Sequence, residues 1–260
     1  MVLSGAGIST ESGIPDYRGP TGAQRRQSPM LFQTFIADAV ARRRYWARSY
    51  LGWRRIAHAV PNDGHAMVAR LETLGLITGV VTQNVDGLHQ AAGSRLVTDL
   101  HGNLSRVVCL SCGDRTSRGS LDDRLRSANA GFMATVTAIN PDGDVDIADD
   151  QLDGFAVVDC LGCGGLLKPD VIFFGENVPP ARVQSCYELL DRSRLLLVLG
   201  SSLTVMSGYR FVRQAAKVGT PVAIVNCGPT RGDNDAALTI DAPLGVALRR
   251  LVSTLTAVSA

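Results

Sequence analysis

The chain has 260 residues, 45% of them hydrophobic, and its 26 Lys and Arg against 24 Asp and Glu leave a net charge of +2. This length can bury a sizeable core in one large domain, or in one domain with a small module attached. A nearly neutral chain has no general attraction for nucleic acid or for a membrane surface, so we expect neither as a partner. Because no apolar run is long enough to span a bilayer and no secretory leader follows Met1, we expect a cytoplasmic protein.

A glycine-rich turn opens the chain. A short apolar run precedes Gly5-Ala6-Gly7, an order typical of a tight strand-to-helix turn whose backbone N–H groups approach a pyrophosphate. Thr10 stands where the dinucleotide-binding fingerprint has its third glycine, so the turn by itself leaves an ordinary turn open as an alternative. An acid, an aromatic residue and a base follow in the same loop, namely Asp16, Tyr17 and Arg18.

Strand and helix patterns alternate along the rest of the chain. Branched apolar runs that end in a polar residue or a glycine predict buried parallel strands at 76–82, 195–199 and 221–226. Apolar residues at helical spacing predict helices at 65–74 and 209–218, and further helices within 24–53. The alternation predicts an α/β fold with a doubly wound parallel, Rossmann-like sheet. Candidate site residues then fall at the carboxyl ends of strands, where such sheets bind ligands: Gly5, Gln83, Gly200 and Asn226.

Four of the six cysteines form two Cys-x-x-Cys pairs separated by a long insertion. Two such pairs deliver four thiolates to one zinc ion, and the glycines that follow each pair favour zinc over redox dithiols, the alternative interpretation. Four thiolates close the coordination sphere, so we expect one structural Zn²⁺ ion. Its ligands would be Cys109, Cys112, Cys160 and Cys163. We expect the remaining two cysteines, Cys186 and Cys227, in the core.

An aspartate-rich segment lies between the two cysteine pairs. Its spacing is superficially that of a calcium-binding loop, but Ile147 stands where such a loop needs glycine and Asp153 where it needs glutamate. We therefore expect a solvated acidic loop that includes Asp144 and Asp146.

Several motifs, in order along the chain, resemble the signature of the sirtuin family of NAD-dependent protein-lysine deacylases. They are GAGIS with GIPDYR at 5–18, TQNVDGLH at 82–89, LHGN at 100–103, the two cysteine pairs, VIFFGE at 171–176, GSSL at 200–203, and VN at 225–226. The resemblance extends over nearly the whole chain. It is strongest to the class II branch typified by the lipoamidase-type, ADP-ribosyltransferase-type sirtuin, and we expect a bacterial source.

This resemblance implies a division of the chain into domains. A Rossmann-like NAD-binding domain would comprise 1–23, 61–106 and 167–260. The smaller domain would have a helical part at 24–60 and a zinc-binding module at 107–166.

The resemblance also implies which residues bind NAD. Backbone groups at Ala6, Gly7 and Ser9, with Ser201 and Ser202, would hold the pyrophosphate. Others would contact the adenosine, the ribose or the nicotinamide, or would order the cofactor loop. The full cofactor-binding set is Gly5, Ala6, Gly7, Ser9, Asp16, Tyr17, Arg18, Gln83, Asn84, Val85, Asp86, Gly200, Ser201, Ser202, Asn226 and Leu244.

Two residues carry the expected chemistry. His101 is the candidate general base, because imidazole can take a proton from a ribose hydroxyl at neutral pH and because its LHGN context matches the sirtuin motif. Asn84 would act with it at the nicotinamide end of the cofactor, where Asp86 would accept from the carboxamide. A plain turn is the alternative interpretation of Asn84-Val85-Asp86-Gly87.

The resulting prediction is an NAD-dependent deacylase that acts on acylated-lysine proteins and transfers the acyl group to ADP-ribose with release of nicotinamide. Tyr45-x-x-Arg48 has the spacing of sirtuins that prefer acidic acyl groups, and the branch resembled includes a lipoamidase, so removal of acidic or longer acyl groups is a second hypothesis beside deacetylation. A protein mono-ADP-ribosyltransferase and a non-catalytic NAD- and zinc-binding module remain the alternatives.

Overall fold

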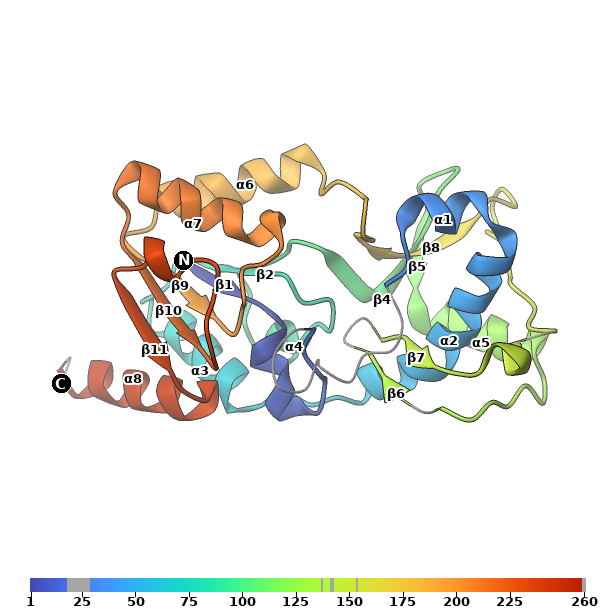
Figure 1. Ribbon diagram of the computed structural model, residues 1–260, viewed down its shortest axis with the longest axis horizontal. Coiled ribbons are helices and arrows are strands. Elements are labelled where there is room, and N and C mark those ends of the chain that lie inside the picture. Colours follow the sequence, from blue (N-terminus) through green and yellow to red (C-terminus); the bar gives the residue numbers. More distant parts are fainter. Residues whose placement is uncertain (18–28, 137, 141–142, 153, 259–260) are drawn as a thin grey trace. The chain divides into compact units, whose positions relative to one another are not determined.

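The structure, a computed structural model, describes residues 1–17, 29–136, 138–140, 143–152 and 154–258. The chain divides into two units (Figure 1): unit 1 comprises Met1–Ala23, Ala59–His101 and Val178–Ala260, and unit 2 comprises Gln24–His58 and Gly102–Asn177. Residues 102–106 and 167–177, which we expected in the NAD-binding domain, fall in unit 2. The reason is that β4 (Gly102–Cys109) and β8 (Leu167–Val171) pair with each other in that unit. Within the described ranges, no helix is both long and apolar enough to cross a membrane.

Unit 1 is built on a six-stranded parallel sheet with the strand order β11-β10-β9-β1-β2-β3. The strands are β1 (Val2–Ser4), β2 (Val80–Thr82), β3 (Val97–Asp99), β9 (Leu196–Leu199), β10 (Val222–Asn226) and β11 (Leu238–Asp241). Successive strands run outward from β1 in one direction and then from β9 in the other. The order therefore reverses between β1 and β9, the place where doubly wound sheets bind their ligands. The predicted fold class is confirmed.

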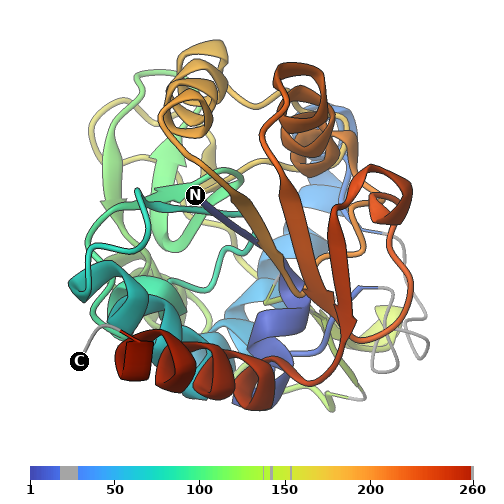
Figure 2. The same cartoon turned by 90° about the vertical axis from the view of Figure 1, so that its left-hand side faces the viewer.

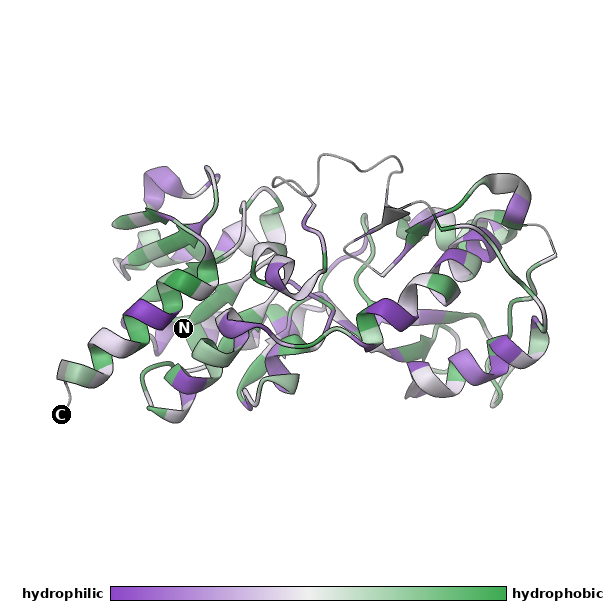
Figure 3. Cartoon of the chain, turned by 90° about the horizontal axis from the view of Figure 1, so that it is seen from below, coloured by the Kyte–Doolittle hydropathy of each residue, from purple (hydrophilic) through white to green (hydrophobic). Residues whose placement is uncertain are grey.

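Helices cover both faces of this sheet (Figure 2). On one face α3 (Asp63–Thr73) and α8 (Leu244–Val258) pack together, and α6 (Pro180–Asp191) and α7 (Met206–Val218) cover the other. Because side chains alternate along a strand, Val2 faces the α3 and α8 side while Leu3 faces the α6 and α7 side. Apolar stretches of α8 are interrupted by polar ones (Figure 3), and Leu244, Leu248 and Leu251, at helical spacing, pack in the core, as expected of a helix with one buried face.

The observed elements begin and end close to the predicted ones, with differences that have local causes. Helix α3 begins two residues before the predicted start because Asn62 caps it, accepting from the backbone N–H of Gly64 at 2.8 Å. The predicted strand at 76–82 is shorter, since only Val80–Thr82 pair in the sheet. Strand β11 went unpredicted because its residues are exposed and show no apolar run.

Unit 2 holds an antiparallel sheet, a two-stranded ribbon and three helices of the described chain. The sheet has the order β5-β4-β8, with β5 at Arg115–Ser117, and the ribbon pairs β6 (Ala138–Ile139) with β7 (Val145–Asp146). The helices are α1 (Phe32–Ala37), α2 (Ala39–Ala57) and α5 (Arg118–Ala128). Short 3₁₀ turns and the one-turn helix α4 (Leu88–Ala91, in unit 1) complete the described elements.

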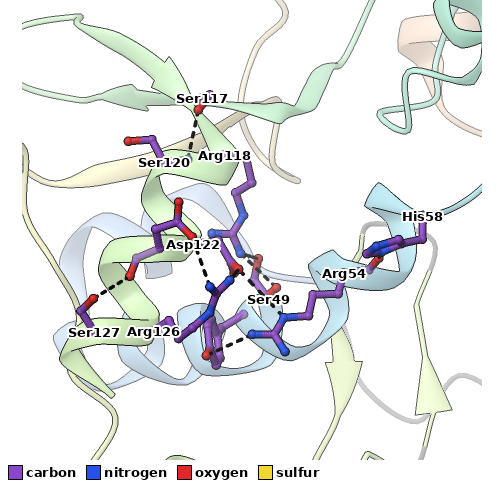
Figure 4. Close-up of polar contacts among 11 residues, drawn as sticks. Ser49, Arg54, His58, Ser117, Arg118, Ser120, Asp122, Arg126 and Ser127 are labelled. Carbon is purple, nitrogen blue, oxygen red and sulfur yellow. Dashed lines mark hydrogen bonds and ion pairs between the residues drawn. The ribbon is translucent and has the colours of Figure 1, made fainter. Parts of the chain in front are cut away.

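A buried arginine joins α5 to α2 in unit 2 (Figure 4). The Arg118 side chain is 1% exposed and lies over the rings of Trp46 and Trp53, at 5.2 and 5.5 Å from their centroids. Its Nη2 donates to the carbonyl oxygen of Ser49 at 3.1 Å. Burial lowers the pKa of Arg118 to about 10, so the group remains charged at neutral pH. A cation between aromatic faces stabilises this helix pair.

Two predictions about single residues are wrong. Asp144 and Asp146 are buried rather than solvated, because the β7 ribbon packs them inside unit 2. Asp144 pairs there with Arg48, whose Nε lies 3.1 Å from its Oδ2. Cys227 is exposed, whereas Cys186 lies in the core as expected.

Candidate active site

The candidate site is built on a close crossing of two backbone segments at the carboxyl ends of β1 and β9. Gly5 donates its N–H to the carbonyl of Leu199 at 3.0 Å, and Gly7 donates to the carbonyl of Gly200 at 2.8 Å. A Cβ on Gly200 would lie 2.5 Å from the backbone nitrogen of Ile8, and Gly200 has a φ of +60°. Only glycine permits this crossing. The amide of Gly7 is thereby used within the protein.

A hydrogen-bonded cluster lies directly after this turn. The Ser9 hydroxyl donates to Oδ2 of Asp86 at 2.7 Å and accepts from Nδ2 of Asn84 at 3.0 Å. Oδ1 of Asp86 accepts from the backbone N–H of Leu88 at 2.9 Å. Burial raises the pKa of Asp86, although the hydrogen bonds from the Leu88 N–H and from the Ser9 hydroxyl act to lower it. The structure thus brings Ser9, Asn84 and Asp86 together from the ends of β1 and β2.

Gln83 connects the glycine crossing to the end of β3. Its Nε2 donates to the Ser201 hydroxyl at 2.8 Å, and its backbone carbonyl accepts from Nδ1 of His101 at 2.9 Å. A carbonyl can only accept, so Nδ1 of His101 carries the proton of the neutral ring. The Nε2 lone pair is left to accept, and in the structure it faces the Ser207 hydroxyl at 2.8 Å.

The surroundings keep His101 uncharged. Burial lowers its pKa to about 4, and Arg182 and Arg210 act in the same direction, while the bond to Gln83 opposes them. A neutral imidazole with a fixed Nδ1–H and an Nε2 that can accept a proton is the arrangement a general base needs.

The two residues predicted to contact the adenosine, Asn226 and Leu244, lie at the end of β10 and at the start of α8. Asn226 ends β10, and its Nδ2 donates to the carbonyl of Gly228 at 2.8 Å. A pocket of about 280 Å³ opens here, with Asn226, Gly228 and Asp241 in its lining. Leu244 is buried at the start of α8.

The other predicted cofactor residues are placed as follows. Ala6 lies in the turn itself, Val85 is half-buried between Asn84 and Asp86, and the Ser202 hydroxyl bonds that of Thr204 at 3.1 Å. Asp16 and Tyr17 are half-buried and have interaction partners. Arg18 lies outside the described residues.

The four predicted zinc ligands converge in unit 2. Sγ of Cys109 lies 3.5 Å from that of Cys163, and Sγ of Cys112 lies 3.8 Å from that of Cys160. All four sulfur atoms lie within 4.8 Å of one another. Tetrahedral zinc with Zn–S bonds of about 2.3 Å requires sulfur atoms about 3.8 Å apart. The donor set therefore fits a structural zinc ion.

Comparison with known proteins decides the family. Residues 5–207 match the model of the Sir2 family. The chain belongs to the Sir2 family. The match includes the glycine turn, the Asn84 to Asp86 segment, His101 and all four cysteines.

Relatives in this family are similar over almost the whole chain. NAD-dependent protein deacetylase 1 of Streptomyces coelicolor is 62% identical over 248 residues, which are 95% of this chain and 83% of that protein. The NAD-dependent protein deacetylase of Bordetella bronchiseptica is 48% identical over 253 residues, 97% of this chain and 92% of that protein.

Solved Sir2-family structures have the same fold. One of Sir2 with a p53 peptide and NAD⁺ has a TM-score of 0.79 and 32% identity, covering 97% of this chain and 91% of that chain. Another holds 2′-O-acetyl-ADP-ribose and a deacetylated p53 peptide, with a TM-score of 0.76, 30% identity, and coverage of 97% and 92%.

Three side chains of this Sir2-family site were missed by the sequence reasoning. Ser207 faces the base nitrogen of His101, His65 contacts the Ser9 hydroxyl, and His89 contacts the Ser4 hydroxyl. His65 also completes a capping box on α3 with Asn62. No local pattern marks Ser207, which lies 106 residues from its partner in the chain.

Proposed function

We propose that this protein is an NAD-dependent protein-lysine deacylase that transfers the acyl group to ADP-ribose. The observation that carries the proposal is the state of His101, which is neutral, protonated on Nδ1 and able to accept on Nε2, beside the crossing of β1 and β9. The names of the relatives and the nucleotide and peptide in the solved structures support the same activity.

NAD would lie across the carboxyl ends of the unit 1 strands. The Gly5 to Gly7 turn and Gly200 would let the pyrophosphate approach the backbone closely, because neither segment has a side chain at the crossing. Since the Gly7 amide already donates to Gly200, we assign the direct phosphate contacts to Ala6, Ser201 and Ser202. Asn226 and Leu244 would border the adenosine.

The nicotinamide end would face Asn84 and Asp86. NAD supplies the ADP-ribose that accepts the acyl group, with loss of nicotinamide. Asp86 would accept from the carboxamide N–H₂, and Asn84 with Gln83 would bond ribose hydroxyls. His101 Nε2 would exchange the Ser207 hydroxyl for a ribose hydroxyl and take its proton, while the Gln83 carbonyl stabilises the imidazolium that forms.

The two units would have different roles. Unit 1 would bind NAD and supply the base, and the four cysteines of unit 2 would hold one structural zinc ion. Acylated-lysine proteins would be the substrates. We also propose a cytoplasmic location, because thiolate ligands persist in a reducing compartment; cell fractionation would test it.

The structure bears on the acyl group as well. Arg48, the residue expected to recognise an acidic acyl group, is buried and paired with Asp144. A guanidinium already paired with a carboxylate gains little from a second one, so we favour neutral acyl groups such as acetyl over acidic ones.

Mass spectrometry of lysine peptides carrying acetyl, glutaryl or lipoyl groups, with and without NAD, tests the proposal. We expect NAD-dependent loss of acetyl with formation of O-acetyl-ADP-ribose. If folded, zinc-loaded protein removes none of these acyl groups, the proposal is refuted. ADP-ribose attached to a protein target, without deacylation, would assign the site to mono-ADP-ribosylation instead.

A further inference from the structure

Two buried histidines that the mechanism does not use contact the hydroxyls of Ser9 and Ser4. His65 is 0% exposed and His89 is 1% exposed, and their rings meet edge to face with centroids 5.0 Å apart. His65 comes from α3 and His89 from α4, so neither lies near the other in the chain. Each ring contacts a serine that is linked to the catalytic segment.

The bonds around His89 select one tautomer. Its Nε2 lies 2.8 Å from the Ser4 hydroxyl, which donates to Oγ1 of Thr82 at 2.9 Å. Since the Ser4 proton is used in that bond, His89 must donate to Ser4 from Nε2. No group of the described residues hydrogen-bonds its Nδ1. An unpaired lone pair on Nδ1 costs less free energy than a proton there, because the proton would be a buried donor without an acceptor.

The far end of this chain of bonds is Asn84. Oγ1 of Thr82 also accepts the backbone N–H of Asn84, at 3.1 Å. His89 therefore connects through Ser4 and Thr82 to the backbone of the residue proposed to bond the ribose.

His65 is held in the same tautomer by different partners. Its Nδ1 accepts from the backbone N–H of Asn62 at 3.4 Å, so the proton of the neutral ring is on Nε2. Nε2 points to the Ser9 hydroxyl at 3.5 Å, and Ser9 gives its own proton to Asp86. Donation from His65 is the only direction open in this contact.

We propose that His65 and His89 are positioning residues of this active site, each a neutral Nε2–H imidazole that directs a serine hydroxyl: Ser9 toward Asp86, and Ser4 toward the Thr82 that holds Asn84. The catalytic consequence rests on the proposed function. A fixed direction of donation keeps the Asp86 and Asn84 polar groups oriented before NAD binds.

Burial supports this assignment. It lowers the pKa of His65 to about 4 and of His89 to about 3, and for His89 the neighbouring His65 adds to the effect. Both rings are therefore neutral donors at the pH at which the enzyme would act.

The tautomers can be measured without any assay of activity. Long-range ¹H–¹⁵N spectra of the zinc-loaded protein report side-chain tautomers, and the chain has only four histidines to assign. At pH 7.5 we expect Nε2–H for His65 and His89 and the opposite, Nδ1–H, for His101. An Nδ1–H or charged ring at His89 or His65 would overturn the proposal.

Substitutions separate positioning from packing. Gln can donate from the place of Nε2, whereas Asn places its amide near Nδ1, where His89 has no partner. We expect His89→Gln to keep kcat/KM for NAD within about threefold and His89→Asn to lose tenfold or more. His65→Leu should also lose tenfold or more. Equal activity of His89→Gln and His89→Asn, both shown folded by circular dichroism, would contradict the proposal.

Ser94→Ala is the matched control. Ser94 is 4% exposed, its hydroxyl has no hydrogen-bond partner in the part of the chain that the structure describes, and its backbone N–H donates to the carbonyl of His89. Loss of this hydroxyl should leave kcat/KM within twofold of the parent. If the parent protein shows no turnover, the proposed function fails, but the tautomer measurement still decides the structural assignment.

Discussion

The chemistry of His101 is set by two hydrogen bonds of opposite sense. The Gln83 carbonyl fixes the proton on Nδ1, and the Ser207 hydroxyl occupies Nε2 until a substrate hydroxyl replaces it. Because the pKa of about 4 keeps the ring neutral, Nε2 can accept a proton at neutral pH; the same low pKa weakens the ring as a base, and the Gln83 carbonyl offsets part of that loss by stabilising the imidazolium.

Replacement of this ring should therefore affect chemistry and spare binding. We predict that His101→Ala lowers kcat for deacetylation at least a hundredfold, while the dissociation constant for NAD changes by less than about tenfold. Single-turnover kinetics and calorimetric titration of NAD measure the two quantities. The exposed His58 gives the control, since His58→Ala should match the parent. Full activity of His101→Ala would remove the base from this residue.

The site residues lie at the ends of secondary-structure elements, and the close approach of the glycines after β1 and β9 sets the geometry of the site. Gly200→Ala places a Cβ 2.5 Å from the Ile8 nitrogen at a φ of +60°. We predict a loss of about 3 kcal/mol in the free energy of unfolding, from the clash and the left-handed backbone together. Urea denaturation measures it.

Gly13→Ala is the control for the backbone effect alone. Gly13 has a φ of +80°, but no atom of the described residues lies within 4 Å of the position that an added Cβ would take. Its loss should be about 1 kcal/mol. Equal losses in both variants would mean that the crossing tolerates a side chain.

The two cysteine pairs of unit 2 are a second local feature on which the structure depends. We predict that Cys109→Ser releases the zinc and unfolds unit 2, because the metal contributes directly to folding in four-thiolate sites. Metal analysis and near-ultraviolet circular dichroism would follow both events. Cys227→Ser, at an exposed cysteine outside the cluster, should keep zinc and structure. A folded, zinc-free and active Cys109→Ser protein would contradict this role.

These elements also show what the sequence could reveal. The glycine turn, the buried strands and the cysteine pairs have local signatures, so the sheet and the thiolate cluster could be predicted. The contacts of His101 with Ser207 and of His89 with Ser4 could not be predicted, because the two residues of each pair are 106 and 85 residues apart in the chain. The burial of Asp144 was missed for the same reason, since its partner Arg48 lies 96 residues away.

The whole molecule should lose stability in mild acid. His65, His89 and His101 have folded-state pKa values of about 4, 3 and 4, below the value of 6.5 expected for an unfolded chain. The unfolded state therefore binds more protons as the pH falls below 6.5, and each histidine costs up to about 1.4 kcal/mol per pH unit. The raised pKa of Asp86 acts in the opposite direction.

We predict a urea midpoint that is nearly constant from pH 8 to 7 and falls between pH 6.5 and 5. In His89→Gln the slope of this fall should decrease by about one proton. A midpoint independent of pH down to 5 would mean that these rings titrate normally in the folded protein.

The stoichiometry of one turnover is the most direct test of NAD-dependent deacylation by this protein. Acetyl-lysine peptide and NAD are mixed with the zinc-loaded protein, and nicotinamide, deacetylated peptide and O-acetyl-ADP-ribose are counted in the same sample. We predict equal amounts of all three products, and none of them above background from His101→Ala. Nicotinamide release without deacetylated peptide, or deacetylation without NAD, would contradict it.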